Sequence, residues 1–300
     1  MNKRIALSLL ILSSFLQIFA ENSSGDYISQ NIGVLKNISM GVYQRDSSIE
    51  NKFRVSAFRI GIYEITRSQF LSIMGFDPSY KKYSSGMDDP VQNVNWYHAI
   101  SFCNKLSLKE NLEAVYKVGN IDFSKLKYTD VPIERNIIWD AVEMNKKANG
   151  YRLPTESEWQ WAAMGSIDDR SKKFSGSDGN NIIDDYAWYY KNSGDVILTD
   201  PWNWADVENN KNRTHPVGVK KPNGNGIFDM SGNVWELCWD IYGQYPNGEY
   251  TNYLGAESGD QRAYRGGGWH YNASYCSVSF RYIINPDSQQ YGVGFRLVRN

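Results

Sequence analysis

A change in composition near Gly165 limits the folds that are open to this sequence. From Gly165 to Asn300 the chain is rich in Gly, Asn, Asp, Trp and Tyr and has no long helical period. This pattern predicts loops and short strands around an aromatic core. The helical patterns all lie earlier in the chain, and no internal repeat is visible. We therefore expect a single α+β domain with low regular secondary-structure content.

Two helix starts are marked by capping boxes. Thr66 is followed three residues later by Gln69, and Gly75 ends the apolar pattern that follows. Thr155 and Glu158 have the same spacing before a second apolar stripe. A side-chain oxygen at the N-cap and a Glu or Gln three residues on satisfy backbone N–H groups that the helix leaves unpaired.

A third helix and one strand are predicted from periodicity. Asn95 is a good N-cap for a helix whose buried stripe contains Cys103, so we expect this cysteine to be a core residue. Apolar residues alternate from Phe53 to Ile62, as in one strand, after a polar stretch over 21–51 that we interpret as its lead-in.

The N-terminus has the pattern of a signal peptide. Met1 to Arg4 carry two positive charges, Ile5 to Phe19 are almost wholly apolar, and Ala20 offers a small residue for cleavage. The apolar run is shorter than the ~20 residues that span a bilayer, so a retained anchor is the weaker interpretation. We expect residues 1–20 to be removed, residues 21–39 to lead into the domain, and the protein to be exported to the periplasm, the cell surface or the medium.

Charge and cysteine content exclude some classes of protein. The formal net charge is −1 and no block of Lys and Arg stands out, which argues against a nucleic-acid partner. Three cysteines are too few, and odd in number, for a disulfide framework, so at most one bridge is expected. We expect a monomer without a membrane span after cleavage.

Six stretches in order closely resemble the sulfatase-modifying factor domain, the family of the formylglycine-generating enzyme. The resemblance covers residues 40–300 and implies a variant of the C-type lectin fold. The stretches are Ile60–Thr66, Pro90–Trp96, Tyr151–Trp159, Gly226–Glu236, Arg265–Gly267 and Gly294–Leu297.

The resemblance also shows where the enzyme's chemistry is altered. Members that generate formylglycine bind copper(I) through two cysteines in an R-G-G-S-x-x-C-x-x-x-x-C segment. Here Gly268 replaces the serine, Tyr271 replaces the first cysteine, and Cys276 alone remains. One thiolate cannot form a two-sulfur copper(I) site, and substitution by His270 is a weak alternative, so copper is not expected. An oxidase with altered metal ligation is kept as the alternative function.

The resemblance implies a structural calcium site. The matching positions are the carboxylates of Asp229 and Glu236 and the carbonyls of Gly232 and Val234. Calcium takes six to eight such hard oxygen ligands. The alternative is a turn in which the two carboxylates only cap loops. A second family site would lie between Tyr186 and Asp200, where the motif is too altered to assign ligands.

The segment 265–300 carries a further signal. Between framework residues, twelve positions hold residues whose codons can all be reached from an Asn codon by changing only adenines. This resembles the variable proteins of diversity-generating retroelements, including those of treponemes, in which the last ~30 residues line a binding surface. The twelve positions are His270, Tyr271, Asn272, Ser274, Tyr275, Phe280, Tyr282, Ile283, Ile284, Asn285, Ser288 and Tyr291.

Three functions remain open at this stage. We expect first an exported protein that binds an unknown protein or surface ligand through those twelve residues, since Tyr, Ser and Asn are favoured in such surfaces. A catalytically inactive relative with a housekeeping binding role comes second. The oxidase with altered metal ligation comes third.

Overall fold

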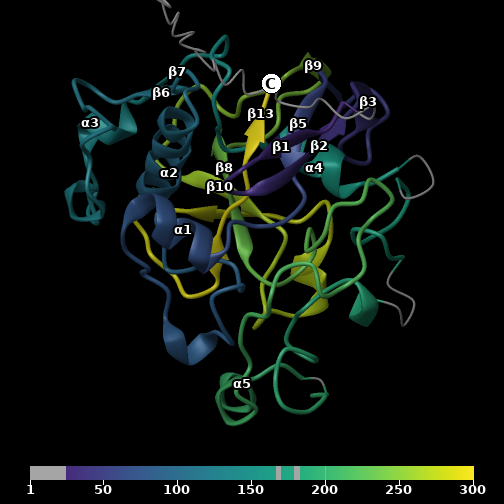
Figure 1. Ribbon diagram of the computed structural model, residues 1–300. Coiled ribbons are helices and arrows are strands. Elements are labelled where there is room, and N and C mark those ends of the chain that lie inside the picture. Colours follow the sequence, from purple (N-terminus) through teal and green to yellow (C-terminus); the bar gives the residue numbers. More distant parts are fainter. Residues whose placement is uncertain (1–24, 167–169, 179–182, 200) are drawn as a thin grey trace, which may run out of the picture.

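The computed structural model describes residues 25–166, 170–178, 183–199 and 201–300, and Figure 1 shows their arrangement. The predicted signal peptide and its cleavage position lie outside these residues. Within the described ranges, every helix is too short or too polar to cross a bilayer.

Two four-stranded sheets form the centre of the fold. The first sheet brings both ends of the described chain together, because it contains the first strand and also the last, which ends at Arg299. All its pairs are antiparallel, and its order is β1 (Tyr27–Ser29), β2 (Gly33–Ile38), β5 (Phe58–Gly61) and β13 (Val298–Arg299). In the second sheet, β12 runs parallel to β8 and the other pairs are antiparallel. Its order is β11 (Arg281–Ile284), β10 (Arg262–Arg265), β8 (Trp235–Ile241) and β12 (Val293–Gly294).

Two smaller sheets lie outside these. One contains β3 (Gly41–Gln44), β4 (Lys52–Val55) and β9 (Glu249–Thr251), and the other contains β6 (Tyr116–Lys117) and β7 (Glu143–Met144).

The strand pattern differs from the prediction in two ways. The single strand expected over Phe53–Ile62 is two strands, β4 and β5, which belong to different sheets. The break falls at Ser56, whose N–H donates to the side-chain oxygen of Asn252 (2.8 Å) instead of to a neighbouring strand. The segment expected as a lead-in, residues 21–39, contains β1 and β2, whose short length hides their alternation.

The three predicted helices are confirmed, with their caps. They are α1 (Arg67–Met74), α2 (Trp96–Lys109) and α4 (Glu156–Ala163). Both capping boxes form, and Gly75 ends α1 with a φ of +77°, a left-handed conformation that glycine adopts without strain. Asn95 caps α2 by accepting from the N–H of His98 (2.9 Å).

Short helices were not predicted because they have too few residues for a period. They are α3 (Ile137–Asp140), α5 (Trp204–Asn209) and the 3₁₀ turns η1 (Lys81–Tyr83), η2 (Tyr128–Asp130), η3 (Ile183–Asp185) and η4 (Ala273–Cys276). Asparagine caps both α3 and α5. The prediction of low regular content after Gly165 otherwise holds.

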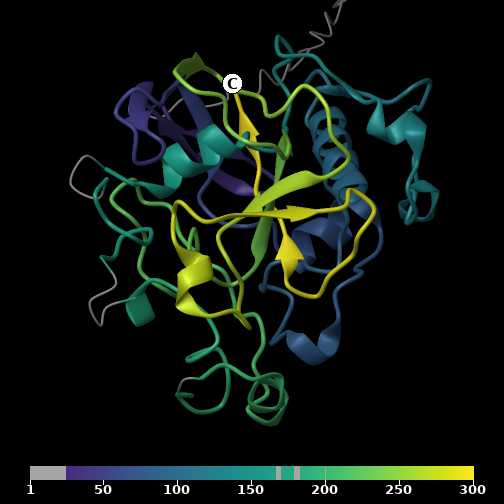
Figure 2. The ribbon, with the colours of Figure 1, turned by 180° about the vertical axis from the view of Figure 1, so that it is seen from behind.

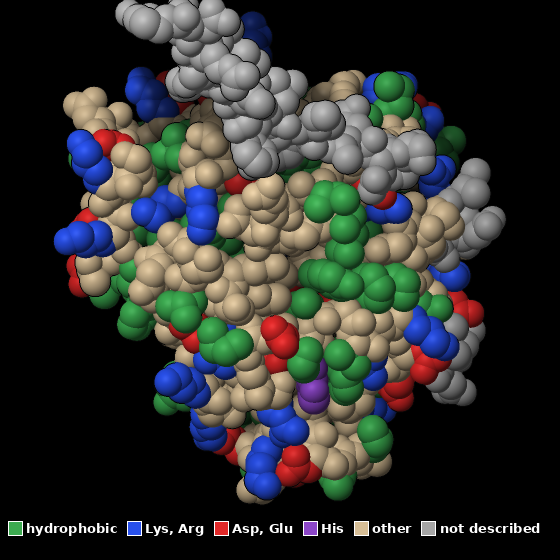
Figure 3. All heavy atoms as spheres, in the orientation of Figure 1, with side chains coloured by type: hydrophobic (Ala, Val, Ile, Leu, Met, Phe, Trp, Pro, Cys, Tyr) green, Lys and Arg blue, Asp and Glu red, His purple; other side chains and the backbone are tan. Residues whose placement is uncertain are grey.

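The largest core cluster lies between α1, α2 and the sheet formed by β11, β10, β8 and β12. Trp96, Trp159 and Trp235 are all almost completely buried, and Cys103 is buried on α2 as expected. On the surface, Lys and Arg alternate with Asp and Glu over the face seen in Figure 3, so this face carries no large field of one sign. The C-terminal segment crosses the opposite side, where Figure 2 shows it in yellow, passing from β10 through η4 to β11.

Candidate functional site

The C-terminal segment leaves β10 through a glycine run that brings the backbone close to Cys276. Gly266 and Gly267 have φ values of +94° and +73°. A Cβ on Gly267 would meet the Sγ of Cys276 at 2.6 Å. Only glycine fits this approach, so the run is a structural turn that holds the following residues against the core.

An aromatic surface lies over the start of β8. The indole of Trp235 and the ring of Tyr264 are buried side by side, with centroids 4.5 Å apart. Four residues of the C-terminal segment surround this indole at 5.4 to 6.4 Å, mostly edge-on or tilted, and we call the six residues together the Trp235 patch. The four are Tyr271, Tyr275, Phe280 and Tyr282.

A second aromatic group continues the surface. The ring of Tyr291 packs against Tyr83 (4.8 Å), Trp204 (5.8 Å) and Trp269 (6.0 Å). His270 connects the two groups, since its ring lies 5.3 Å from Tyr291 and 4.4 Å from Tyr271. Residues that are 20 positions apart in the chain therefore share one surface.

The twelve predicted binding residues differ in exposure. Three are exposed, namely Ser274, Tyr282 and Asn285. Seven are half-buried, namely Tyr271, Asn272, Tyr275, Phe280, Ile283, Ser288 and Tyr291. These ten can contribute atoms to a surface, although the half-buried rings also pack on the core.

Two of the twelve are buried, which differs from the exposed surface expected for this set. His270 is 7% exposed and Ile284 is 3% exposed. The His270 ring fills the space beside Gly292, where a Cβ would come within 2.4 Å of it. Ile284 ends β11 opposite Arg262 and belongs to the main core cluster. The apolar character of Ile284 is a signal of burial in the sequence itself, whereas the burial of His270 depends in part on Trp204 of α5 (ring centroids 5.8 Å apart) and could not be read from the segment.

The support for this surface comes from residues that the prediction did not include. Trp235 and Tyr264 lie on β8 and β10, and Tyr83 and Trp204 come from η1 and α5. Trp235 belongs to the Gly226–Glu236 motif, and this membership was the one feature of the sequence that could have indicated its importance. Its position under the C-terminal segment follows only from the pairing of β8 with β10 and β12.

The aromatic part of this surface is uncharged near neutral pH. Burial lowers the pKa of His270 to about 3, so the imidazole is neutral. Burial raises the pKa of Tyr271 and of Tyr291, which keeps both phenols protonated. The cation next to the patch in sequence, Arg281, is paired with Glu156 (Nε to Oε1, 3.0 Å).

Cys276, the remaining cysteine of the altered motif, is fully buried. Burial raises the pKa of its thiol to about 12, so it is protonated at neutral pH. Cys103 and Cys238 are also buried, in other core clusters, and all three thiols are free.

The segment proposed for calcium is a tight turn leading into β8. Asp229, Gly232 and Asn233 all have positive φ, at 56°, 83° and 57°. One carboxylate oxygen of Asp229 accepts from the N–H of Gly218 (2.7 Å), whereas its Oδ1 is buried and has no partner among the described residues. An unpartnered buried carboxylate oxygen is where a cation would be stabilising.

The negative charge of Glu236, the other carboxylate of the predicted calcium site, is already neutralised by an arginine. Glu236 is fully buried and accepts from Arg296 (Nε to Oε2, 2.6 Å; Nη2 to Oε1, 2.8 Å) and from the indole N–H of Trp159 (2.8 Å). Glu64 lies nearby, and burial raises its pKa well above the usual range, helped by Asp229 and Glu236. Two cations, Arg296 and, near Asp229, Lys220, therefore face three acidic groups.

A calcium ion here would depend on backbone oxygens. The described part of the chain contains no group of three or more His, Cys, Asp or Glu side chains placed to hold a metal. The residues nevertheless fit an oxygen-binding cation, because Asp229 Oδ1 lacks a partner and the acids exceed the available positive charge.

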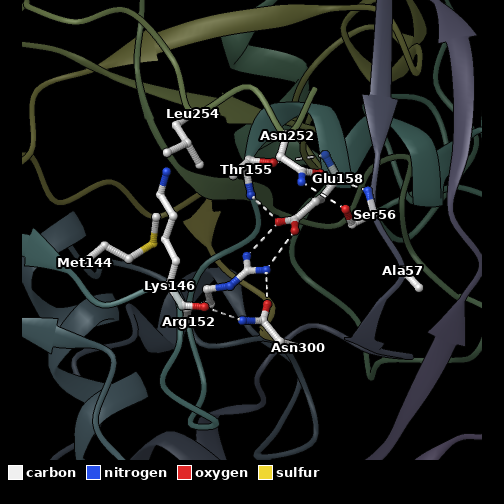
Figure 4. A pocket seen from close by; sticks show the side chains of 10 residues that line it. All are labelled: Ser56, Ala57, Met144, Lys146, Arg152, Thr155, Glu158, Asn252, Leu254 and Asn300. Atoms are coloured by element: carbon white, nitrogen blue, oxygen red, sulfur yellow. Dashed lines mark hydrogen bonds and ion pairs between the residues drawn. The ribbon is translucent and has the colours of Figure 1, made fainter. Parts of the chain in front are cut away.

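A separate cavity of about 310 Å³ lies beside α4 (Figure 4). Its floor is the ion pair of Arg152 with Glu158 (Nη1 to Oε2 and Nη2 to Oε1, both 2.7 Å). Arg152 also donates to the side chain of Asn300 (2.8 Å), so both of its terminal nitrogens have acceptors. The cavity contains none of the predicted site residues.

Comparisons with known proteins identify relatives over almost the whole chain. Residues 31–300 match the family described as the sulfatase-modifying factor enzyme 1-like domain. The chain is 36% identical over 298 residues to "Chaperone protein LppX" of Paenibacillus barcinonensis, covering 98% of each protein. It is 30% identical over 178 residues to the formylglycine-generating enzyme of Streptomyces coelicolor, covering 54% of this chain and 50% of that enzyme.

Solved structures show the same fold. "Treponema denticola variable protein 1" superposes with a TM-score of 0.78 at 36% identity, covering 89% of this chain and 94% of that one. The structure titled CarF superposes with a TM-score of 0.62 at 23% identity, covering 88% and 97%, which is a likeness of fold alone.

Proposed function

This chain belongs to the sulfatase-modifying factor enzyme 1-like family, and from that premise we propose that it is an exported binding protein without oxidase activity. Its ligand surface is the Trp235 patch together with the exposed and half-buried varied residues around it. The observation that carries the proposal is that the positions singled out in the sequence gather on one face of the structure. Ten of the twelve positions reach the surface, while Cys276, Val278 and Pro286 between them are buried and three other framework residues, Ala273, Arg281 and Asp287, are half-buried.

The chemistry of the surface suits a protein ligand. Tyrosine supplies a large contact area for little loss of side-chain entropy, and Ser and Asn adapt their hydrogen bonds to the partner. The rings of the Trp235 patch interlock edge-on and lie on a buried indole, so they are held in place before a ligand arrives. A rigid support with a variable outer layer can change specificity without refolding.

The relatives support the same class of function. The 36% identical solved structure is titled a variable protein, and the relative that covers 98% of the chain is named a chaperone. Neither name describes an oxidase. Export is supported by the N-terminal pattern of charge, apolar run and Ala20. A calcium ion at Asp229 and the neighbouring carbonyls is part of the proposal, in a structural role.

Diversification of the segment can be tested on the genome. We expect a near-identical template repeat with Asn codons at the twelve positions, beside a gene for a reverse transcriptase. If the locus holds neither, the segment is an ordinary fixed sequence, and the binding proposal then depends on the next experiment alone.

Binding can be tested with a displayed library. The ten exposed and half-buried varied positions are randomised, His270 and Ile284 are kept, and binders are selected against a purified test protein such as hen lysozyme. We expect selected clones that stay folded and bind the test protein, because the randomised side chains lie at the surface while His270 and Ile284 keep their places in the core. Failure to obtain any folded binder would contradict a tolerant binding surface.

A further inference from the structure

A groove runs between the C-terminal end of α1, the last turns of α2 and the loop 121–129. It consists of two hollows of about 620 and 320 Å³ that share Ile73 and Lys105, so they are continuous. Figure 1 shows α1 lying against α2, and loop 121–129 forms the opposite wall. None of the twelve varied positions lines either hollow.

The lining of the groove is mainly apolar, and part of it faces solvent. Phe76 is 51% exposed and its ring lies 4.7 Å from that of Tyr128, so the two rings form one wall. Leu108 is 39% exposed on the α2 side. Ile73 and Leu126 are buried beneath. Exposed apolar side chains gathered in a hollow are typical of binding sites rather than of an ordinary surface.

Three lysines border this apolar lining, and none of them has an ion pair with a carboxylate of the described residues, although Asp130 acts on Lys105 through its charge. The half-buried ammonium of Lys105 donates to the carbonyl of Leu126 (2.7 Å), and burial lowers its pKa. Lys109 and Lys127 have no ion pair within the described part of the chain. The carboxylate of Asp130 accepts from the backbone N–H of Lys127 (2.9 Å).

We propose that this groove binds a segment of a partner polypeptide that carries apolar side chains flanked by Asp or Glu. The apolar side chains fill the two hollows, as in helix-in-groove recognition. The carboxylates reach the ammonium groups of Lys105, Lys109 and Lys127. Lys105 gains most from this contact, because its charge is half-buried and its hydrogen bond goes to a carbonyl, with Asp130 acting only through its charge and without an ion pair.

A polypeptide fits better than a fatty acid or another single-chain amphiphile. One carboxylate can neutralise only one of the three lysines. One alkyl chain also supplies a single apolar group, whereas the groove has two hollows, with lysines on α2 and on the facing loop. Several acidic and several apolar side chains on one backbone match this arrangement.

The probe is a fluorescein-labelled amphipathic peptide of about 14 residues, a length that allows a helix in the groove. It has Leu and Phe on one face and Glu elsewhere, and two matched peptides carry Gln or Lys in place of Glu. We expect fluorescence anisotropy to show the Glu peptide binding roughly tenfold more tightly than the Gln peptide, with the Lys peptide weakest. Equal binding of all three, or of none, would overturn the proposal.

Variants of the full-length protein locate the site. Lys105→Gln with Lys109→Gln, and separately Phe76→Ser, should each weaken binding of the Glu peptide roughly tenfold. The matched controls Lys146→Gln with Lys147→Gln, and Ile137→Ser, change exposed residues elsewhere and should have no effect. Equal effects of both sets would contradict the site. Binding of dodecanoate without peptide binding would assign the groove to amphiphiles and overturn the polypeptide proposal.

Discussion

Asp229 illustrates how one residue connects charge, pH and a metal. Its carboxylate is buried, and burial raises its pKa to about 6, with Arg296 and the Gly218 N–H acting in the opposite direction. In the unfolded chain the pKa is ~3.9. The folded state therefore holds this proton more tightly, and stability is lost as the pH rises from about 4 through 6.

The Asp229→Asn variant is therefore predicted to differ from the wild type in stability in one direction with chelator and in the other with calcium. In chelator at pH 7, Asp229→Asn should be more stable than the wild type by up to about 3 kcal/mol, because the variant keeps the acceptor for Gly218 and removes the buried charge. With millimolar calcium, the wild type should gain stability by mass action and the variant should not. Thermal unfolding at pH 4, 6 and 7 measures both effects.

The control for this prediction is Asp88→Asn, which changes an exposed aspartate on another loop. It should follow the wild type in chelator and in calcium. If calcium leaves the wild-type melting temperature unchanged, the ion does not bind at this turn. If Asp229→Asn is destabilising in chelator, the carboxylate is needed for another reason than a cation.

At the scale of the element, the C-terminal segment combines surface and core functions. Ser274, Tyr282 and Asn285 are exposed, whereas His270 and Ile284 are buried. The exposed residues can be replaced without disturbing the core, whereas the buried ones cannot. The half-buried rings lie on Trp235, so they contribute to packing as well as to the proposed binding surface.

A denaturation series separates the two contributions. Replacing Ser274, Tyr282 and Asn285 together by Ala should change the free energy of unfolding by no more than about 0.5 kcal/mol per site, as for other surface positions. Ile284→Ala should cost about 2–5 kcal/mol and Trp159→Ala about 3–5 kcal/mol. Urea unfolding followed by tryptophan fluorescence gives these values.

The triple variant is the decisive member of the series. A loss comparable to that of Ile284→Ala would show that the exposed residues support the fold, and would remove the basis for a replaceable surface. Circular dichroism of the folded baseline confirms that each variant is compared in the same state.

At the scale of the whole molecule, the family fold is kept while the enzyme's metal-binding pair is altered. Tyr271 occupies the position that the resemblance assigns to the first cysteine, and it packs on Trp235. Cys276 is buried, with its thiol pKa at about 12. A buried, protonated thiol without a second sulfur is a poor copper(I) ligand.

We therefore expect no conversion of cysteine to formylglycine. Purified protein is incubated with a C-x-P-x-R peptide, copper and oxygen, and the peptide is followed by mass spectrometry. The formylglycine-generating enzyme of Streptomyces coelicolor is the positive control. Conversion at a rate close to that of the control would show that the altered site is catalytic, and would replace the binding proposal by the oxidase alternative.

The sequence by itself determined the local features of this protein. Thr66, Asn95 and Thr155 begin the three main helices where predicted, because a cap is formed by groups within three residues of one another. The family resemblance and the altered cysteine motif could also be read directly, since each depends on residues at fixed spacing.

The tertiary structure decided which side chains are covered. It placed Trp235 and Tyr264 under aromatic rings of the C-terminal segment, turned His270 and Ile284 inward, and divided one alternating stretch into β4 and β5. Burial depends on partners outside the segment, such as Trp204 of α5 for His270 and Arg262 of β10 for Ile284. A pattern within one segment contains no information on which other segment will cover it, and for that reason the sequence could not divide the twelve predicted positions into exposed and buried ones.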